Sequence, residues 1–184
     1  LGRESSAKNV VFVLGASSAL VDFIRRRPQA LSLLEKVSAL PNRAELDEVF
    51  GLATKKIEST DAAWTAIRIV YREQLLRISA FDVTSPSPEA VLPDVAAALA
   101  DLAGAAIEAG LQVARWELTN TSEFGSYSAQ EVAATRLSVI AMGKCGAREL
   151  NYISDVDVIY VAEPTRPLYI SYAVFCLYKK TSRP

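Results

Sequence analysis

The stretch that decides the fold is "MGKCGARELNYISDVDVIYV", residues 142–161. It places Asp155 and Asp157 one residue apart at the start of an apolar run rich in β-branched side chains. Side chains alternate between the two faces of a strand, so an extended backbone directs both carboxylates to one side. Val156 and Val158 then face a core. The pattern predicts a buried strand whose entrance borders a polar site.

A second strand is predicted just upstream. "LSVIAMG", residues 137–143, is a short apolar run with β-branched members that ends at a glycine. We therefore predict two strands, over residues 137–143 and 155–161, joined by a polar connection.

The residues around the two acids predict a metal and phosphate site. Like charges at this spacing repel unless a cation lies between them, and hard carboxylate oxygens suit Mg²⁺ or Mn²⁺. Gly143 allows close backbone approach of an anion, Lys144 adds positive charge beside it, and Ser154 offers a hydroxyl donor. We predict Asp155 and Asp157 as metal ligands, with the other three residues holding phosphate.

Three common motifs do not fit this stretch. A P-loop needs glycine where Ser138 stands and Ser or Thr where Cys145 stands. A dinucleotide fingerprint needs three glycines, and an EF-hand needs more oxygen ligands than this run supplies. Two acids one residue apart are by themselves weak evidence for a metal site. The alternative is that both acids simply stand in solvent at the start of a strand.

The sequence before this stretch has the apolar spacing of a helical bundle. Apolar residues recur at helical spacing from about residue 10 to residue 117, and breaks fall near residues 15–18, 41 and 85–88. An alanine-rich run over residues 96–109 favours close helix packing. We predict an α+β fold, with a helical region over 1–118, a linker or loop over 119–135 and a partial sheet domain over 136–184.

Composition excludes several classes of function. The chain has 184 residues, a net charge of −1 and no histidine. The charge balance favours neither nucleic acid nor an anionic membrane as partner, and the missing histidine excludes a histidine base or a histidine-ligated zinc. Cys145 and Cys176 match no disulfide framework. We also expect no signal peptide and no membrane span, so the predicted location is cytoplasmic.

The longer string "SVIAMGKCGARELNYISDVDVIYV" resembles the nucleotidyltransferase core of bacterial glutamine synthetase adenylyltransferase/adenylyl-removase, within the DNA polymerase β-like superfamily. That core has a glycine turn after an apolar strand and, about a dozen residues later, an acid, a hydrophobe and a second acid. Lys144 stands where the wider superfamily usually has Gly or Ser. Weaker resemblance extends upstream, so that about residues 10–163 are covered, and the sheet is expected to be the partial mixed sheet of that fold.

The resemblance implies a reaction. The "ELN" run at residues 149–151 is more similar to the adenylyl-removing core, in which orthophosphate attacks the AMP–tyrosyl bond of modified glutamine synthetase and releases ADP. Asp155 and Asp157 would then bind Mg²⁺, and the implied partners are glutamine synthetase, a PII-type signal protein, orthophosphate and an adenine nucleotide such as ATP.

One departure from the family pattern leaves an alternative open. The superfamily needs a third carboxylate on a later strand, and the chain after Glu163 is an apolar, aromatic tail without an acid. We expect the chain to be a fragment, which puts its activity alone in doubt. The alternative is a helical docking module for glutamine synthetase or a PII-type protein, with a degenerate core.

Overall fold

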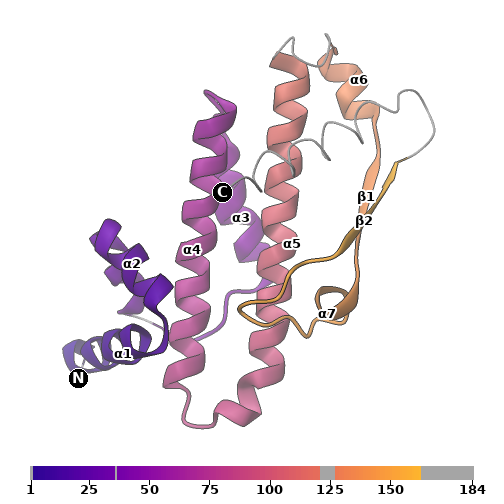
Figure 1. The fold of residues 1–184 in the computed structure, drawn as a ribbon. Coiled ribbons are helices and arrows are strands. Elements are labelled where there is room, and N and C mark those ends of the chain that lie inside the picture. Colours follow the sequence, from indigo (N-terminus) through magenta and orange to yellow (C-terminus); the bar gives the residue numbers. More distant parts are fainter. Residues whose placement is uncertain (1, 36, 121–126, 163–184) are drawn as a thin grey trace.

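The computed structural model describes residues 2–35, 37–120 and 127–162, and in this part the chain is mostly helical with one small sheet (Figure 1). The elements in chain order are α1 (Gly2–Ala16), α2 (Ser18–Arg26), the 3₁₀ helix η1 (Pro28–Leu34), α3 (Arg43–Thr54), α4 (Thr60–Thr84), α5 (Pro88–Asn120), α6 (Ala129–Ala134), β1 (Leu137–Ala141), α7 (Gly143–Gly146) and β2 (Val158–Ala162).

The long helices α4 and α5 form an antiparallel hairpin that organises the molecule (Figure 1). Helix α3 packs against both, while α1, α2 and η1 pack against α4, and the strands lie beside α5. The predicted breaks near residues 15–18 and 41 are confirmed by side-chain caps, because Ser17 and Asn42 each accept a hydrogen bond from a backbone N–H in the first turn of the following helix. Ser59 caps α4 in the same way.

The main core lies between α3, α4 and α5. Leu46 and Phe50 of α3 meet Ile67 and Ile78 of α4 and an alanine-rich face of α5. The small side chains of that face are buried and allow close approach, as the sequence predicted: Ala98, Ala100, Ala103, Ala105 and Ala109. A second core cluster joins the first three helical elements to the far side of α4.

Helix α5 is, among the described residues, the one helix long and apolar enough to cross a membrane by length and composition. Much of its surface faces the protein, because Leu99, Leu102 and Val113 are buried against the neighbouring helices. These contacts are typical of the core helix of a bundle.

The two strands pair antiparallel, and the register runs from Leu137 opposite Ala162 to Ala141 opposite Val158. The second strand therefore begins three residues later than predicted. Asp155 to Asp157 form a lead-in to the strand, because β1 ends at Ala141 and the chain then turns into α7, leaving the lead-in without a full pairing partner.

Two other segments also differ from expectation. Residues 28–34 form a 3₁₀ helix that ends where the amide of Asn9 donates a buried hydrogen bond to the Leu34 carbonyl. Within the predicted linker, residues 129–134 form α6, which begins with a capping box between Ser128 and Glu131. The rest of that linker, residues 121–126, and the tail after Glu163 lie outside the described residues.

Candidate functional site

The turn after β1 requires glycine at two positions. Gly143 has a φ of +53°, a left-handed conformation that side chains disfavour. At Gly146 a Cβ would collide with the carbonyl of Ala141. The turn then closes through backbone hydrogen bonds from Gly146 N–H to Met142 O, 3.0 Å, and from Ala147 N–H to Gly143 O, 3.0 Å. Both glycines are needed for this shape.

Asp157, the second of the two acids, lies directly beside that turn. Met142 N–H donates to the carbonyl of Asp157 at 2.8 Å, which extends the ladder by one bond beyond β2. Asp157 Oδ2 lies 3.9 Å from the position that a Cβ would take on Gly143. Asp155 and Asp157 are exposed, whereas Val156 between them is half-buried against the main core. The predicted alternation is confirmed, and it leaves both carboxylates in solvent.

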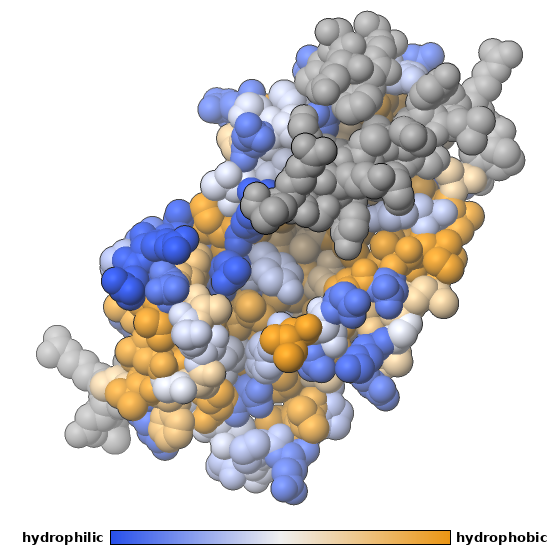
Figure 2. All heavy atoms as spheres, in the orientation of Figure 1, coloured by the Kyte–Doolittle hydropathy of each residue, from blue (hydrophilic) through white to orange (hydrophobic). Residues whose placement is uncertain are grey.

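The acids share a sheet face with exposed apolar residues. By alternation, Asp157, Ile159 and Val161 lie on the face turned away from the helices, and Ile140 of β1 lies opposite Ile159 on the same face. Figure 2 shows hydrophobic residues gathered over the strand region. The acids therefore stand at one end of an apolar, solvent-facing sheet surface.

Lys144 and Ser154 relate differently to this turn. Lys144 is exposed on α7, next to Gly143. Ser154 is half-buried, and its hydroxyl donates to Asn151 Oδ1 at 2.7 Å. Asn151 Oδ1 also accepts from Ile153 N–H at 3.2 Å, so its side chain fixes the local bend. The structure thus brings Gly143, Lys144 and Asp157 together, whereas the Ser154 hydroxyl takes part in the bend of the connecting loop.

The donor set fits a hard divalent cation but is incomplete within the described residues. Neither Asp155 nor Asp157 makes a side-chain hydrogen bond or ion pair in the part of the chain that the structure describes. No group of three Asp, Glu, Cys or His side chains that could hold a metal ion occurs among residues 2–35, 37–120 and 127–162. Two carboxylates leave room for water and phosphate oxygens, which Mg²⁺ prefers as further ligands.

Comparison with known proteins adds a family to this geometry. A family profile described as glutamate-ammonia ligase adenylyltransferase matches residues 7–170. The chain belongs to this family. No solved structure matches it.

Relatives in the family are longer than this chain. It is 44% identical over 163 residues to the bifunctional glutamine synthetase adenylyltransferase/adenylyl-removing enzyme of Leifsonia xyli subsp. xyli, covering 85% of this chain and 16% of that enzyme. It is 44% identical over 157 residues to the enzyme of that name from Mycolicibacterium smegmatis, covering 82% and 15%. The enzyme of that name from Mycobacterium marinum is 41% identical over 176 residues, covering 93% and 17%.

Inside this adenylyltransferase-family core, Cys145 is a structural residue. Its side chain is 7% exposed and packs in the main core with Leu150. Burial raises the pKa of the Cys145 thiol, so the protonated form is favoured at neutral pH.

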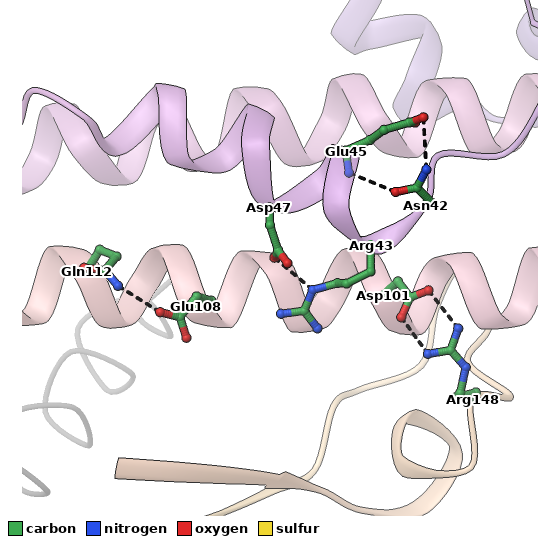
Figure 3. Close-up of polar contacts among 8 residues, drawn as sticks. All are labelled: Asn42, Arg43, Glu45, Asp47, Asp101, Glu108, Gln112 and Arg148. Atoms are coloured by element: carbon green, nitrogen blue, oxygen red, sulfur yellow. Dashed lines mark hydrogen bonds and ion pairs between the residues drawn. The ribbon is translucent and has the colours of Figure 1, made fainter. Parts of the chain in front are cut away.

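Two contacts at the site escaped sequence reasoning. Arg148 pairs with Asp101 of α5 through two hydrogen bonds, and Tyr152 donates to Asp82 of α4 at 2.9 Å (Figure 3 shows the first). The sequence contains only a weak signal for these contacts. Asp101 is an acid within an alanine-rich helix, which indicates that it has a partner but does not identify that partner.

An apolar groove of about 430 Å³ lies between α4, α5 and the sheet. Its lining includes Trp64, Tyr71, Leu111, Val139 and Tyr160, together with the exposed Arg68 and Arg72. Val139 and Tyr160 lie opposite each other in the sheet. Because side chains alternate between the two faces, Tyr160 lies on the opposite face from Asp155 and Asp157, and the groove opens on the face of Tyr160. It is separate from the candidate site.

Proposed function

We propose that this chain is part of a Mg²⁺-dependent nucleotidyltransferase core that removes AMP from adenylylated glutamine synthetase by phosphorolysis. The observation that carries the proposal is the placement of Asp157 against the left-handed turn at Gly143, with Asp155 on the same side of the backbone. Family membership supports it, because the relatives are named as adenylyltransferase/adenylyl-removing enzymes of glutamine synthetase.

Each residue has a defined part in this proposal. Asp155 and Asp157 would hold Mg²⁺, which neutralises phosphate oxygens when bound. The Gly143 turn gives a phosphate group close access to backbone N–H groups, and Lys144 adds a positive charge beside it. Ser154 is the fifth predicted site residue, acting through a hydroxyl that here donates to Asn151.

The reaction needs positioning more than proton transfer. An orthophosphate oxygen forms a bond to the phosphorus of the AMP group, the bond from that phosphorus to the tyrosine oxygen breaks, and the tyrosine oxygen gains a proton. The products are ADP and unmodified glutamine synthetase. Since orthophosphate is already a nucleophile, a histidine base is not required, and catalysis rests on alignment and charge neutralisation.

The longer protein would supply what this chain lacks. The chain covers 14–17% of the relatives' lengths, so a third carboxylate and the second, AMP-attaching core would lie outside it. We place the chain in the adenylyl-removing half on the "ELN" run at residues 149–151, and propose a cytoplasmic enzyme that responds to a PII-type signal protein and uses adenine nucleotides such as ATP.

The test uses a full-length enzyme that contains this region. Replacing Asp155 or Asp157 with Asn should lower Mg²⁺-dependent ADP release from adenylylated glutamine synthetase and orthophosphate by roughly 10²- to 10³-fold, because a preorganised charge-stabilising group is lost. Asp47→Asn, which breaks an exposed ion pair within α3, is the control and should leave the rate unchanged.

Three results would change the proposal. ADP release that persists in both variants would remove the metal pair from the mechanism. Loss of AMP attachment in place of AMP removal would assign the chain to the other half of the enzyme. Binding of glutamine synthetase or a PII-type protein by the 184-residue chain, without any response to Mg²⁺ or nucleotide, would support the docking-module alternative.

A further inference from the structure

The loop between α7 and β2 reaches both arms of the helical hairpin. Asp101 lies on α5 and Asp82 lies near the end of α4, whereas their partners Arg148 and Tyr152 stand four residues apart in the loop. Leu150, midway between those partners, is buried in the main core. The loop is therefore fixed at three successive points before it reaches the acids.

The contact of Arg148 with Asp101 is a two-point ion pair. Arg148 Nη1 donates to Asp101 Oδ1 at 2.6 Å and Nη2 donates to Oδ2 at 2.7 Å. The side chain of Asp101 is only 14% exposed and that of Arg148 is 55% exposed. Two parallel bonds to a largely buried carboxylate define the orientation of the arginine as well as its distance.

Arg148 also has an unusual backbone. Its φ is +60°, in the left-handed region that a residue other than glycine rarely adopts. Glycine would suit this backbone better than arginine. An arginine at such a position, paired with an acid 47 residues away in sequence, points to a role for the pair itself.

The contact of Tyr152 with Asp82 is also directional. The Tyr152 hydroxyl donates to Asp82 Oδ2 at 2.9 Å, across 70 residues of sequence. The residue is 42% exposed, but desolvation of the hydroxyl and the nearby Asp82 carboxylate raise the pKa of Tyr152 well above its usual range. The tyrosine therefore stays protonated and acts as a donor.

We propose that Arg148 and Tyr152 are positioning residues, which by pairing with Asp101 and Asp82 hold the loop that carries Asp155 and Asp157 against the Gly143 turn. The helices α4 and α5 then form part of the architecture of the metal site. The inference rests on the proposed function, since a fixed loop acquires a chemical role when its acids bind a cation. Asp82 and Asp101 accept the hydrogen bonds of these two residues.

The test measures Mn²⁺ binding to the 184-residue chain by the electron paramagnetic resonance signal of free Mn²⁺, together with amide hydrogen exchange over residues 151–157. Tyr152→Phe removes one hydroxyl and Arg148→Lys keeps the charge while losing the two-point geometry. Each should weaken Mn²⁺ binding by about 10- to 100-fold, the usual effect of removing a group that orients a metal ligand. Exchange over residues 151–157 should become faster.

Matched variants separate positioning from general stability. Asp22→Asn breaks the Arg25–Asp22 pair, an exposed ion pair within α2, and should change neither readout. Exchanging the charges with Asp101→Arg and Arg148→Asp should recover part of the Mn²⁺ affinity that Asp101→Arg alone loses. If the exchanged variant does not fold, Tyr152→Phe carries the test, because it keeps the ring.

The outcomes distinguish this inference from the proposed function. If Asp155→Asn and Asp157→Asn abolish Mn²⁺ binding but Tyr152→Phe and Arg148→Lys match the wild type in both readouts, the metal site stands and the positioning role is wrong. If the two Asn variants bind Mn²⁺ as the wild type does, the proposed metal site fails. Exchange over residues 151–157 then decides whether the two contacts hold the loop, and unchanged exchange overturns the inference.

Discussion

The backbone N–H of Met142 donates to the carbonyl of Asp157 at 2.8 Å, and this bond joins the residue before the glycine turn to the second acid of the pair. It explains how a two-stranded sheet can place a carboxylate next to Gly143, because the bond lies just past the last paired residues, Ala141 and Val158. The relative position of the turn and Asp157 is therefore set by the backbone, and any change in the turn should also shift Asp157.

Gly143→Ala is expected to lower the free energy of unfolding by about 1–2 kcal/mol, because an L side chain disfavours the left-handed backbone at this position. The added Cβ would meet Asp157 Oδ2 at 3.9 Å, an ordinary contact distance, so backbone strain and not collision causes the loss. Urea denaturation followed by far-ultraviolet circular dichroism measures the change.

Gly51→Ala is the matched control for this experiment. Gly51 lies within α3 with open space around its Cα, and alanine suits a helix better than glycine. The substitution should raise the free energy of unfolding by about 0.5–1 kcal/mol. Equal effects of the two substitutions would show that residue 143 does not need its left-handed conformation.

The sequence predicted those parts of the structure that depend on local pattern. The break at Ser17, the start of α3 after Asn42 and the start of α5 at Pro88 follow from capping chemistry and proline. The start of β2 was placed too early because an extended lead-in and a strand have the same alternation. The lead-in and the strand are distinguished only by the pairing of the two strands, in which Ala141 and Val158 are the last paired residues.

Leu102→Ala is expected to lower the free energy of unfolding by about 2–5 kcal/mol, the usual cost of a cavity left by a core leucine. Leu102 is fully buried in the main core, at 0% exposure, on the face of α5 that packs against the other helices. Leu92→Ala on the same helix is the control: Leu92 is 61% exposed and should cost no more than about 0.5 kcal/mol. A small loss at Leu102 would contradict the described packing of α5.

The contacts of the connecting loop could not be predicted, because each joins residues far apart in sequence. Arg148 and Asp101 are 47 positions apart, and Tyr152 and Asp82 are 70 apart. Their meeting depends on the packing of α4 against α5 and on the burial of Leu150, neither of which appears in a local pattern. The candidate acids, in contrast, were found because their spacing has a meaning within one strand.

The capping box of α6 should respond to acid. Glu131 accepts a hydrogen bond from Ser128 N–H at 2.9 Å, and this bond lowers the pKa of the Glu131 carboxyl below its ordinary value of 4.5. Because the folded-state pKa is the lower one, the contribution of the cap is fully present above the ordinary value. It is lost as the pH falls through the lowered pKa. The amides of Ser128 and Glu131 should therefore lose protection from hydrogen exchange in that acidic range, once the rates are corrected for intrinsic pH dependence.

Glu131→Gln is the control for this experiment. It keeps a hydrogen-bonding side chain at this position without a titrating group, so the protection of these amides should stay level over the same range. A variant that loses protection in parallel with the wild type would assign the acid response to other carboxyl groups, and the Glu131 cap would then have no part in it.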